Sequence, residues 1–202
     1  FRWGLDNRIH GTASGTPGKV RVVGKPELAA VSLVRSDFSF DPRTLEFRLE
    51  SGGAQHGMDF NAAGQKFVCS NSHHIQQVMY EQRYAGANPN FMPQSPLVDI
   101  PVDGASAPVF RLSPDEAWRV IRTRWRVAKQ VSGPVEGGGR PSGYFTAATG
   151  VTIYAGHAWP SGYSGAAYIA DAGSNLDHRK KLRSYGIKFT AQRPDHERDR
   201  EF

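Results

Sequence analysis

Short runs of apolar residues separated by turns recur along this chain. The clearest example spans residues 149–182, where the runs 150–154, 166–170 and 176–182 follow one another. Gly, Pro and Ser fill the segment 156–165 between the first two runs, and Asp171-Ala172-Gly173 ends the second. Apolar runs bounded by such turn residues predict three antiparallel strands in a meander.

The same order of elements occurs earlier in the chain. Residues 57–60, 66–71 and 74–80 form a second copy, and residues 3–11 form a shortened copy with a tight turn at Asp6-Asn7. Imperfect repeats of a strand meander are typical of β-propellers, in which each blade buries its faces against its neighbours. The sequence therefore predicts an all-β fold, a partial propeller of four-stranded antiparallel blades. A chance recurrence of short strands and Gly turns is the alternative.

Length and composition set the size of this unit. The chain has 202 residues with 22 Gly and 13 Pro, which suits one globular domain over residues 1–202 with many turns. Since a blade takes roughly 40–50 residues, we expect about three to four blades and an incomplete ring. No apolar run reaches about 18 residues, so no membrane span is expected. The residues contain no signal peptide, and the start at Phe1 within a repeat indicates an excised chain.

Residues 81–143 interrupt the repeats and predict a long insertion over the propeller face. Prolines crowd its first part, at Pro89, Pro93, Pro96, Pro101 and Pro108. Ser113-Pro114-Asp115-Glu116 matches a capping box and predicts a helix start. Residues 121–127 alternate and favour extended chain after a short helix, although helical spacing also fits them. A Gly-rich loop at 133–143 ends the insertion.

Charge and cysteine content exclude several kinds of site. The net charge is +6, but the Lys and Arg residues are scattered, which favours a solvated surface over a nucleic-acid-binding face. The single Cys69 excludes an internal disulfide and a multi-Cys zinc site, and its apolar strand predicts a buried, inert thiol. Adjacent side chains on a strand point to opposite faces, so His73 and His74 are not expected to share a metal ion. The charged residues 195–202 predict a frayed tail.

Polar residues that close the apolar runs are the candidate site residues, because strand ends from successive blades converge near the central channel. The wider set includes Ser14, Ser72, Thr149 and His178, whereas Lys180 and Lys181 are expected on an exposed outer strand. The alternative is that these are ordinary turn residues, which favour the same residue types. The chosen candidates are His10, Gln55, His56, Asn71, Tyr144, Asp171, Asn175 and Arg179.

Several motifs resemble known protein families. Residues 149–156, Trp159-Pro160 and residues 165–170 resemble the late-blade signature of quinoprotein glucose and sorbosone dehydrogenases, and residues 3–10 resemble their early-blade pattern. Residues 1–11, 67–71, 119–126, 133–145 and 170–179 more closely resemble a bacterial family of exported, membrane-bound dehydrogenases. This resemblance covers nearly the whole chain. It implies a six-bladed propeller, and many members carry a haem c domain downstream.

The resemblance implies a fragment of a sugar or alcohol dehydrogenase that uses pyrroloquinoline quinone (PQQ), with calcium, and passes electrons to a haem or a cytochrome-type acceptor. It places the chain in the periplasm or outside the cell. Gln55, Asn71 and Arg179 would contact the cofactor. The remaining candidates, His10, His56, Tyr144, Asp171 and Asn175, would contact the substrate.

The chain also departs from the sugar dehydrogenases. Their catalytic base precedes the position of Phe1, so the fragment alone is expected to be inactive. Ser14-Gly15 stands where they carry an orienting Asp, and Ala54-Gln55 stands where they carry an Arg-Asn pair. The alternative function is a non-catalytic propeller module that binds carbohydrate or a partner protein.

Overall fold

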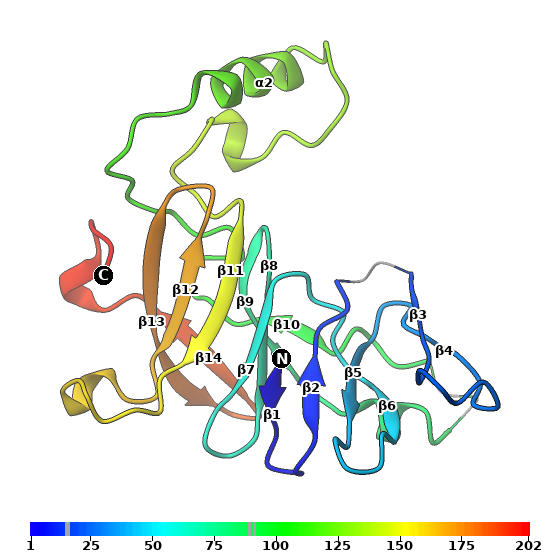
Figure 1. The fold of residues 1–202 in the computed structure, drawn as a ribbon. Helices are drawn as coiled ribbons and strands as arrows, with labels where there is room; N and C mark the ends of the chain where they lie inside the picture. Colours follow the sequence, from blue (N-terminus) through cyan, green and yellow to red (C-terminus); the bar gives the residue numbers. More distant parts are fainter. Residues whose placement is uncertain (15–16, 89, 91) are drawn as a thin grey trace.

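The structure is a computed structural model that describes residues 1–14, 17–88, 90 and 92–202, and most of its regular secondary structure is antiparallel β-sheet (Figure 1). The all-β prediction is confirmed. Gly15, which was matched to the family's orienting Asp, Thr16 in the expected loop and Pro89 in the proline-rich stretch lie outside the described residues.

Within the described residues, three four-stranded sheets and one two-stranded hairpin make up the β-structure. Sheet I contains β1 (Arg2–Trp3), β2 (Ile9–Gly11), β5 (Asp37–Phe40) and β6 (Phe47–Glu50). Sheet II contains β7 (Gly57–Phe60), β8 (Lys66–Ser70), β9 (His73–Val78) and β10 (Leu97–Asp99). Sheet III contains β11 (Ala148–Ile153), β12 (Ala167–Asp171), β13 (Leu176–Tyr185) and β14 (Lys188–Gln192). The hairpin pairs β3 (Lys19–Val20) with β4 (Val31–Ser32).

Sheets II and III repeat one topology, as the sequence copies predict. In each, four consecutive strands pair in chain order. Phe67 and Tyr168 are the second residues of β8 and β12, and each pairs with a residue of the strand before and the strand after. They therefore occupy equivalent places in the two sheets, as expected from the repeats.

The sheets pack face to face, with sheet II in the middle (Figure 1). One face of sheet II packs on sheet III, in a core that includes Phe67, Ile75 and Ile169. Val68 and Met58 belong to a smaller cluster on its other face. Successive side chains of β8 point to opposite faces, and both Phe67 and Val68 are apolar and buried. This strand is therefore covered on both sides.

The first strands of the three sheets lie side by side. Asp59 on β7 accepts a hydrogen bond of 3.0 Å from Arg2 Nε of β1 and one of 2.7 Å from the backbone N–H of Ile153 on β11. Gly57 lies where β7 approaches β11 closely, since a Cβ there would be 2.9 Å from the backbone nitrogen of Gly150. One carboxylate and one glycine thus fix the spacing of these strands.

Sheet I meets sheet II through polar side chains. Lys66 Nζ of β8 lies 2.6 Å from the Asp37 carboxylate of β5, and both side chains are buried. Arg8 reaches Ser39 Oγ at 2.9 Å on the same face of sheet I. The alternating register places Ile9, Phe38 and Phe40 on the opposite face, away from sheet II.

The insertion differs from its prediction in two elements. Helix α2 (Ala117–Val127) is continuous, so extended chain at 121–127 was wrong. Its N-cap is Glu116, which makes no side-chain capping bond, and not Ser113. Arginine favours helices, and ion pairs of Arg119 with Glu116 and Arg126 with Glu136 tie both ends of this helix to neighbouring segments. Strand β10 lies within residues 81–143 but completes sheet II.

Short helical segments complete the secondary structure. They are α1 (Gln82–Ala85) and the single turns η1 (Gly137–Gly139), η2 (Ser161–Tyr163) and η3 (Asp195–Glu197). Helix α2 and η1 form an arm, residues 111–143, that stands beyond one end of sheets II and III (Figure 1). No helix among the described residues is long and apolar enough to cross a membrane.

The C-terminal residues are packed on sheet III, which corrects the prediction of a frayed tail. Glu197 and Glu201 are largely buried: Glu197 forms an ion pair with Arg179, and Glu201 forms an ion pair with Arg193 and a hydrogen bond with His178. Lys180 is also completely buried, contrary to the expected exposure, because its ammonium group pairs with Asp103 at 2.5 Å. Lys181 is exposed as expected. The glutamates of this tail are thus paired with Arg179 on β13 and with Arg193 directly after β14.

Candidate functional site

Three of the predicted residues meet at one end of the sheets. Gln55 and His56 precede β7, and Asn71 lies in the turn between β8 and β9. The Gln55 side-chain oxygen accepts a hydrogen bond of 3.2 Å from the Asn71 backbone N–H. All three side chains are exposed. They form one polar surface on sheet II.

The start of β11 brings residues of sheet III to the same end. The Ala148 N–H donates to the Asn71 carbonyl at 3.1 Å, and Ala148 pairs with Asp171 across the sheet. The Thr149 hydroxyl donates to the His56 carbonyl at 3.0 Å. The ends of four strands therefore converge here. We call this surface the strand-end cluster; its members are Gln55, His56, Asn71, Thr149, Asp171 and Asn175.

Asp171 and Asn175 shape the turn between β12 and β13. Asp171 is fully buried, and its Oδ1 accepts a hydrogen bond of 2.8 Å from the Ala147 N–H, while Oδ2 has no hydrogen-bond partner in the part of the chain that the structure describes. Asn175 is exposed and has a φ of 61°, a left-handed conformation that asparagine tolerates. Asp171 thus holds the start of β11 against this turn, and Asn175 presents its amide to solvent.

The arm is anchored beside this cluster. Arg119 of α2 donates to the Gly173 carbonyl in the β12–β13 turn at 3.3 Å. Ser72, next to Asn71, lies 3.5 Å from a Glu136 carboxylate oxygen. Tyr144 is buried where the chain returns from the arm, and its ring lies directly against Gly137. The structure therefore places Tyr144 at the base of the arm.

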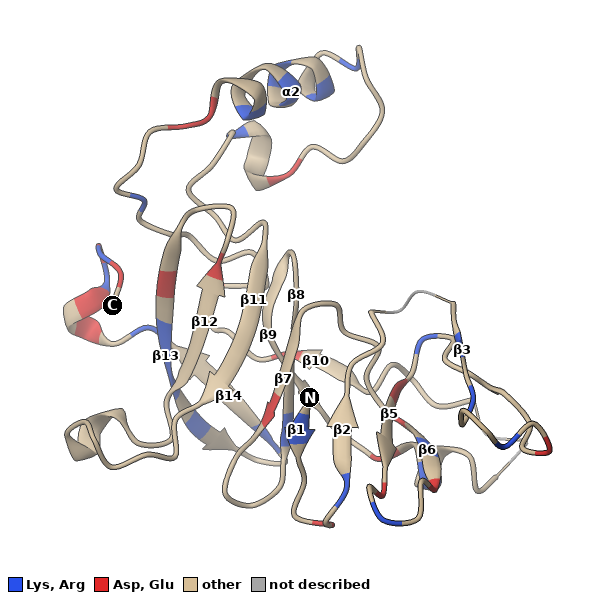
Figure 2. Ribbon diagram, viewed as in Figure 1, with Lys and Arg blue, Asp and Glu red and all other residues tan. Residues whose placement is uncertain are grey.

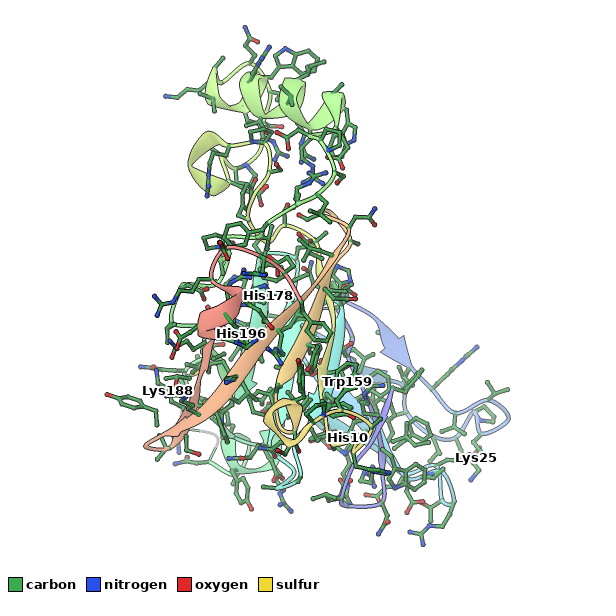
Figure 3. All side chains as sticks on the ribbon, turned by 90° about the vertical axis from the view of Figure 1, so that its left-hand side faces the viewer. His10, Lys25, Trp159, His178, Lys188 and His196 are labelled. Atoms are coloured by element: carbon green, nitrogen blue, oxygen red, sulfur yellow. The ribbon has the colours of Figure 1, made fainter. Side chains whose placement is uncertain are left out.

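His10 lies elsewhere. Its ring packs edge-on against Phe60 at 5.1 Å, and Phe60 is the last residue of β7 whereas Gln55 and His56 precede the first. Its Nε2 lies 3.1 Å from the Asp6 carboxylate. Figure 3 shows His10 toward the end of the body remote from helix α2. His10 is therefore not part of the strand-end cluster.

Arg179 is also separate from the cluster. It is 2% exposed, its guanidinium pairs with Glu197, and it lies 4.3 Å from the ring centroid of Tyr163. Along β13, Arg179 points to the face opposite that of His178 and Lys180. The expected meeting of Arg179 with Asn71 therefore does not occur, and Arg179 instead fixes the C-terminal segment to sheet III.

The sequence analysis did not predict that two buried histidines lie together. His74 and His178 are fully buried with ring centroids 5.8 Å apart, and Phe145 stacks on His74 at 4.3 Å. His74 Nδ1 lies 2.5 Å from the Ala105 carbonyl, and His178 Nδ1 lies 2.7 Å from Glu201. Among the described residues, neither Nε2 atom has a hydrogen-bond partner. Figure 3 shows His178 beside the C-terminal segment.

The surroundings keep both imidazoles neutral. Burial lowers the pKa of His74 well below its usual value, and the positive charge of Lys180 adds to this effect. Burial also lowers the pKa of His178, and it outweighs the opposing effect of the Glu201 carboxylate. Burial raises the thiol pKa of Cys69 to about 11, which agrees with the predicted inert thiol.

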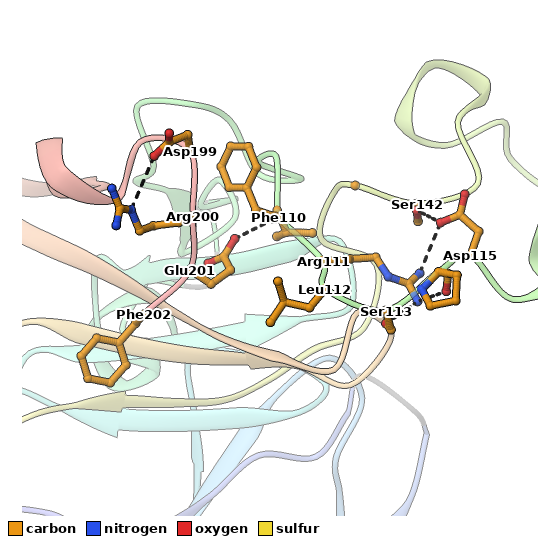
Figure 4. A pocket seen from close by; sticks show the side chains of 13 residues that line it. Phe110, Arg111, Leu112, Ser113, Asp115, Ser142, Asp199, Arg200, Glu201 and Phe202 are labelled. Atoms are coloured by element: carbon orange, nitrogen blue, oxygen red, sulfur yellow. Dashed lines mark hydrogen bonds and ion pairs between the residues drawn. The ribbon is translucent and has the colours of Figure 1, made fainter.

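A pocket beside the C-terminal segment is lined by residues other than those of the strand-end cluster (Figure 4). It has a volume of about 770 Å³ and lies between residues 109–115, Ser142-Gly143 and the C-terminal residues 199–202. Arg111 in its wall is already bound by Glu116, whose pKa this guanidinium lowers to about 2. None of the eight predicted residues lines this pocket.

Among the described residues, neither the strand-end cluster nor the pocket contains a group of metal ligands. Within the described part of the chain, no group of three or more His, Cys, Asp or Glu residues is arranged to hold a metal ion. His73 and His74 point apart, as predicted: His73 is exposed and lies 2.9 Å from Asp99, whereas His74 is buried. The strand-end cluster is thus a set of amide, imidazole and hydroxyl groups above the buried carboxylate of Asp171.

Comparison with known proteins gives one match. The family model described as Domain of unknown function (DUF7133) matches residues 1–202. The chain belongs to the DUF7133 family. No curated protein and no solved structure matches it. The strand-end cluster of this DUF7133 chain is therefore interpreted from its own geometry.

Proposed function

We propose that this DUF7133 chain is a three-blade segment of a six-bladed β-propeller of the quinoprotein-dehydrogenase type, and that its strand-end cluster binds a sugar or alcohol. The observation that carries the proposal is the convergence of Gln55, His56 and Asn71 from sheet II with Thr149 and Asn175 from sheet III. Gln55 and Asn175 are far apart in the sequence. Convergence of equivalent strand ends is how propellers form ligand sites.

The packing of the sheets supports the propeller. Phe67 points from sheet II toward sheet III, and the equivalent Tyr168 points from sheet III toward its outer side, together with Trp159 and Phe202. The other end of the stack carries Phe38 and Phe47, whose rings lie 5.4 Å apart on the outer side of sheet I. Both outer faces thus present aromatic side chains of the kind that blade neighbours cover.

The donors and acceptors of the cluster suit hydroxyl groups. The Asn71 and Asn175 amides and the His56 imidazole can each both donate and accept hydrogen bonds. The side chains of His56 and Asn71 are exposed and make no side-chain hydrogen bond among the described residues. A polyol, which carries many groups that are both donors and acceptors, matches this neutral surface.

PQQ fits these residues less well. The quinone carries three carboxylates, which require cationic partners. Arg179, the expected partner, is bound to Glu197, and Arg119 beside the cluster is bound to Glu116. No redox step is therefore assigned to these side chains. This observation favours the second candidate, a propeller module that binds carbohydrate without catalysis, and both candidates share polyol binding at the same cluster.

Titration calorimetry with glucose and other polyols tests the proposal. We expect His56→Ala and Asn71→Ala to weaken binding by about tenfold, since each removes one or two hydrogen bonds. Gln192→Ala is the matched control, because Gln192 is exposed at the end of the edge strand β14. Absence of polyol binding, or equal loss in the control, contradicts the proposal. Adding PQQ and calcium separates the candidates, because a change in the quinone absorption on binding favours the dehydrogenase even without turnover, which this chain alone is not expected to perform.

A further inference from the structure

Helix α2 carries an exposed apolar stripe. Trp118, Ile121 and Trp125 follow one another at spacings of three and four residues, so they lie on one face of the helix. They are 53%, 44% and 48% exposed. The opposite side of the helix packs on the arm, where Arg119 is buried and Val127 lies close to Gly139. The stripe therefore faces away from the rest of the arm.

Cations flank this stripe. Four of the eleven residues of α2 are arginines, and the helix contains no acidic residue. Arg119 and Arg126 are paired with Glu116 and Glu136. Three further cations, Arg122, Arg124 and Lys129, form no ion pair within the described residues. Figure 2 shows these positive charges gathered along α2 at the outer end of the arm.

Trp118 at the edge of the stripe lies between two arginines, the partly exposed Arg122 and the buried Arg119. The Arg122 guanidinium lies 4.7 Å from the ring centroid of Trp118, and that of Arg119 lies 5.1 Å from it. An amphipathic helix with tryptophan and isoleucine on one face and arginine beside them is the pattern that places a helix in the headgroup region of a bilayer. Tryptophan is enriched at that depth because its ring is apolar and its N–H is polar.

We propose that helix α2 binds the surface of an anionic lipid bilayer, lying in the headgroup region with Trp118, Ile121 and Trp125 inserted. Two observations favour a bilayer over an acidic polypeptide. The stripe lies on the convex surface of a helix. It does not line the pocket formed by residues 109–115, 142–143 and 199–202. The helix also stands at the extremity of the molecule, where a plane can reach it without contacting the sheets (Figure 1). This inference rests on α2 alone and is independent of the proposed function.

Co-sedimentation with vesicles tests this proposal. The purified chain is expected to bind vesicles of phosphatidylcholine mixed with phosphatidylglycerol, and to bind vesicles of phosphatidylcholine alone far less. Added salt is expected to weaken binding because it screens the charges. Arg122→Gln/Arg124→Gln/Lys129→Gln should lower partitioning roughly 100-fold, since each cation near an anionic surface contributes about fivefold. Trp118→Ala/Trp125→Ala should lower it about tenfold or more.

Matched variants separate this surface from general charge and hydrophobicity. Lys19→Gln/Arg21→Gln/Lys25→Gln removes three exposed cations near the β3–β4 hairpin, and Trp159→Ala removes an exposed tryptophan of sheet III. Both should bind vesicles as the unchanged chain does. Far-ultraviolet circular dichroism confirms that each variant is folded. Equal binding by the α2 variants and the unchanged chain overturns the proposal, as does binding to poly-glutamate without binding to vesicles.

Discussion

At the scale of single residues, buried charges carry much of the specificity of this structure. Lys66 and Asp37 join sheets I and II across an interface that is polar on the side of sheet I. Asp37 also accepts the Gly53 N–H at 2.9 Å, so its carboxylate is surrounded by donors. Breaking such a pair leaves one charge buried without its partner, which costs more free energy than the pair itself contributes.

Lys66→Met is therefore expected to lower the free energy of unfolding by about 3 kcal/mol. The measurement is urea denaturation followed by circular dichroism. Arg43→Ala, which breaks the exposed pair with Asp41, serves as control and should leave stability unchanged. An equal loss of unfolding free energy in Lys66→Met and Arg43→Ala would show that burial does not increase the contribution of the Lys66–Asp37 pair.

The two buried histidines predict a loss of stability in acid. Their folded pKa values are lower than the usual 6.5, so the unfolded chain binds more protons. Stability is then complete above about pH 6.5 and decreases as the pH falls toward the folded values. His74→Phe keeps the stacking on Phe145 and removes one titrating group. It should reduce the difference in unfolding free energy between about pH 8 and about pH 5. An unchanged difference contradicts this account.

At the scale of elements, the contact of β7 with β11 depends on a missing side chain. A Cβ at Gly57 would be 2.9 Å and 3.0 Å from the backbone nitrogens of Gly150 and Val151 and 3.2 Å from Cys69 Sγ. Backbone atoms cannot turn aside as a side chain can. The two strands would have to separate, which would also lengthen the hydrogen bond that the Ile153 N–H donates to the Asp59 carboxylate.

Gly57→Ala is expected to destabilise the chain by about 1–3 kcal/mol, the usual cost of overpacking. Gly162→Ala is the control, since a Cβ at Gly162 meets nothing within 4 Å. Denaturant unfolding of both variants provides the measurement. If the two substitutions have the same effect, the close approach of these strands does not limit their packing.

At the scale of the whole molecule, the stacking order predicts where the structure is most stable. Sheet II is covered by sheet III on one side and sheet I on the other, whereas each outer sheet is covered by a sheet on one side. Local opening should therefore cost most free energy in β8 and β9.

Hydrogen exchange is expected to follow this order. Amides of Phe67, Val68 and Ile75 should exchange about 100-fold more slowly than those of β6, which is the edge strand of sheet I. Exchange measured by mass spectrometry on short peptides checks the difference. Equal protection in β6 and β8 would be inconsistent with a central sheet II.

The sequence determined the strands by itself, because strand formation depends on local patterns. Apolar runs bounded by Gly, Asp and Asn located β7, β8, β11 and β12 within one or two residues. The copies of one meander also predicted that Phe67 and Tyr168 occupy equivalent places. The convergence of Gln55, Asn71 and Asp171 follows from the same repeats, since equivalent strand ends lie on the same side of successive sheets.

Only the tertiary structure decided how the charges are used. The charged segment at 195–202 is locally typical of a frayed end, but His178, Arg179 and Arg193 bind its glutamates. Arg179 and Lys180 are adjacent in sequence, yet their directions are opposite because strand residues alternate between faces. Residues 121–127 fit both a helix and a strand, and ion pairs with Glu116 and Glu136 stabilise the helix. Partners distant in sequence determined these features, and a local pattern contains no information about them.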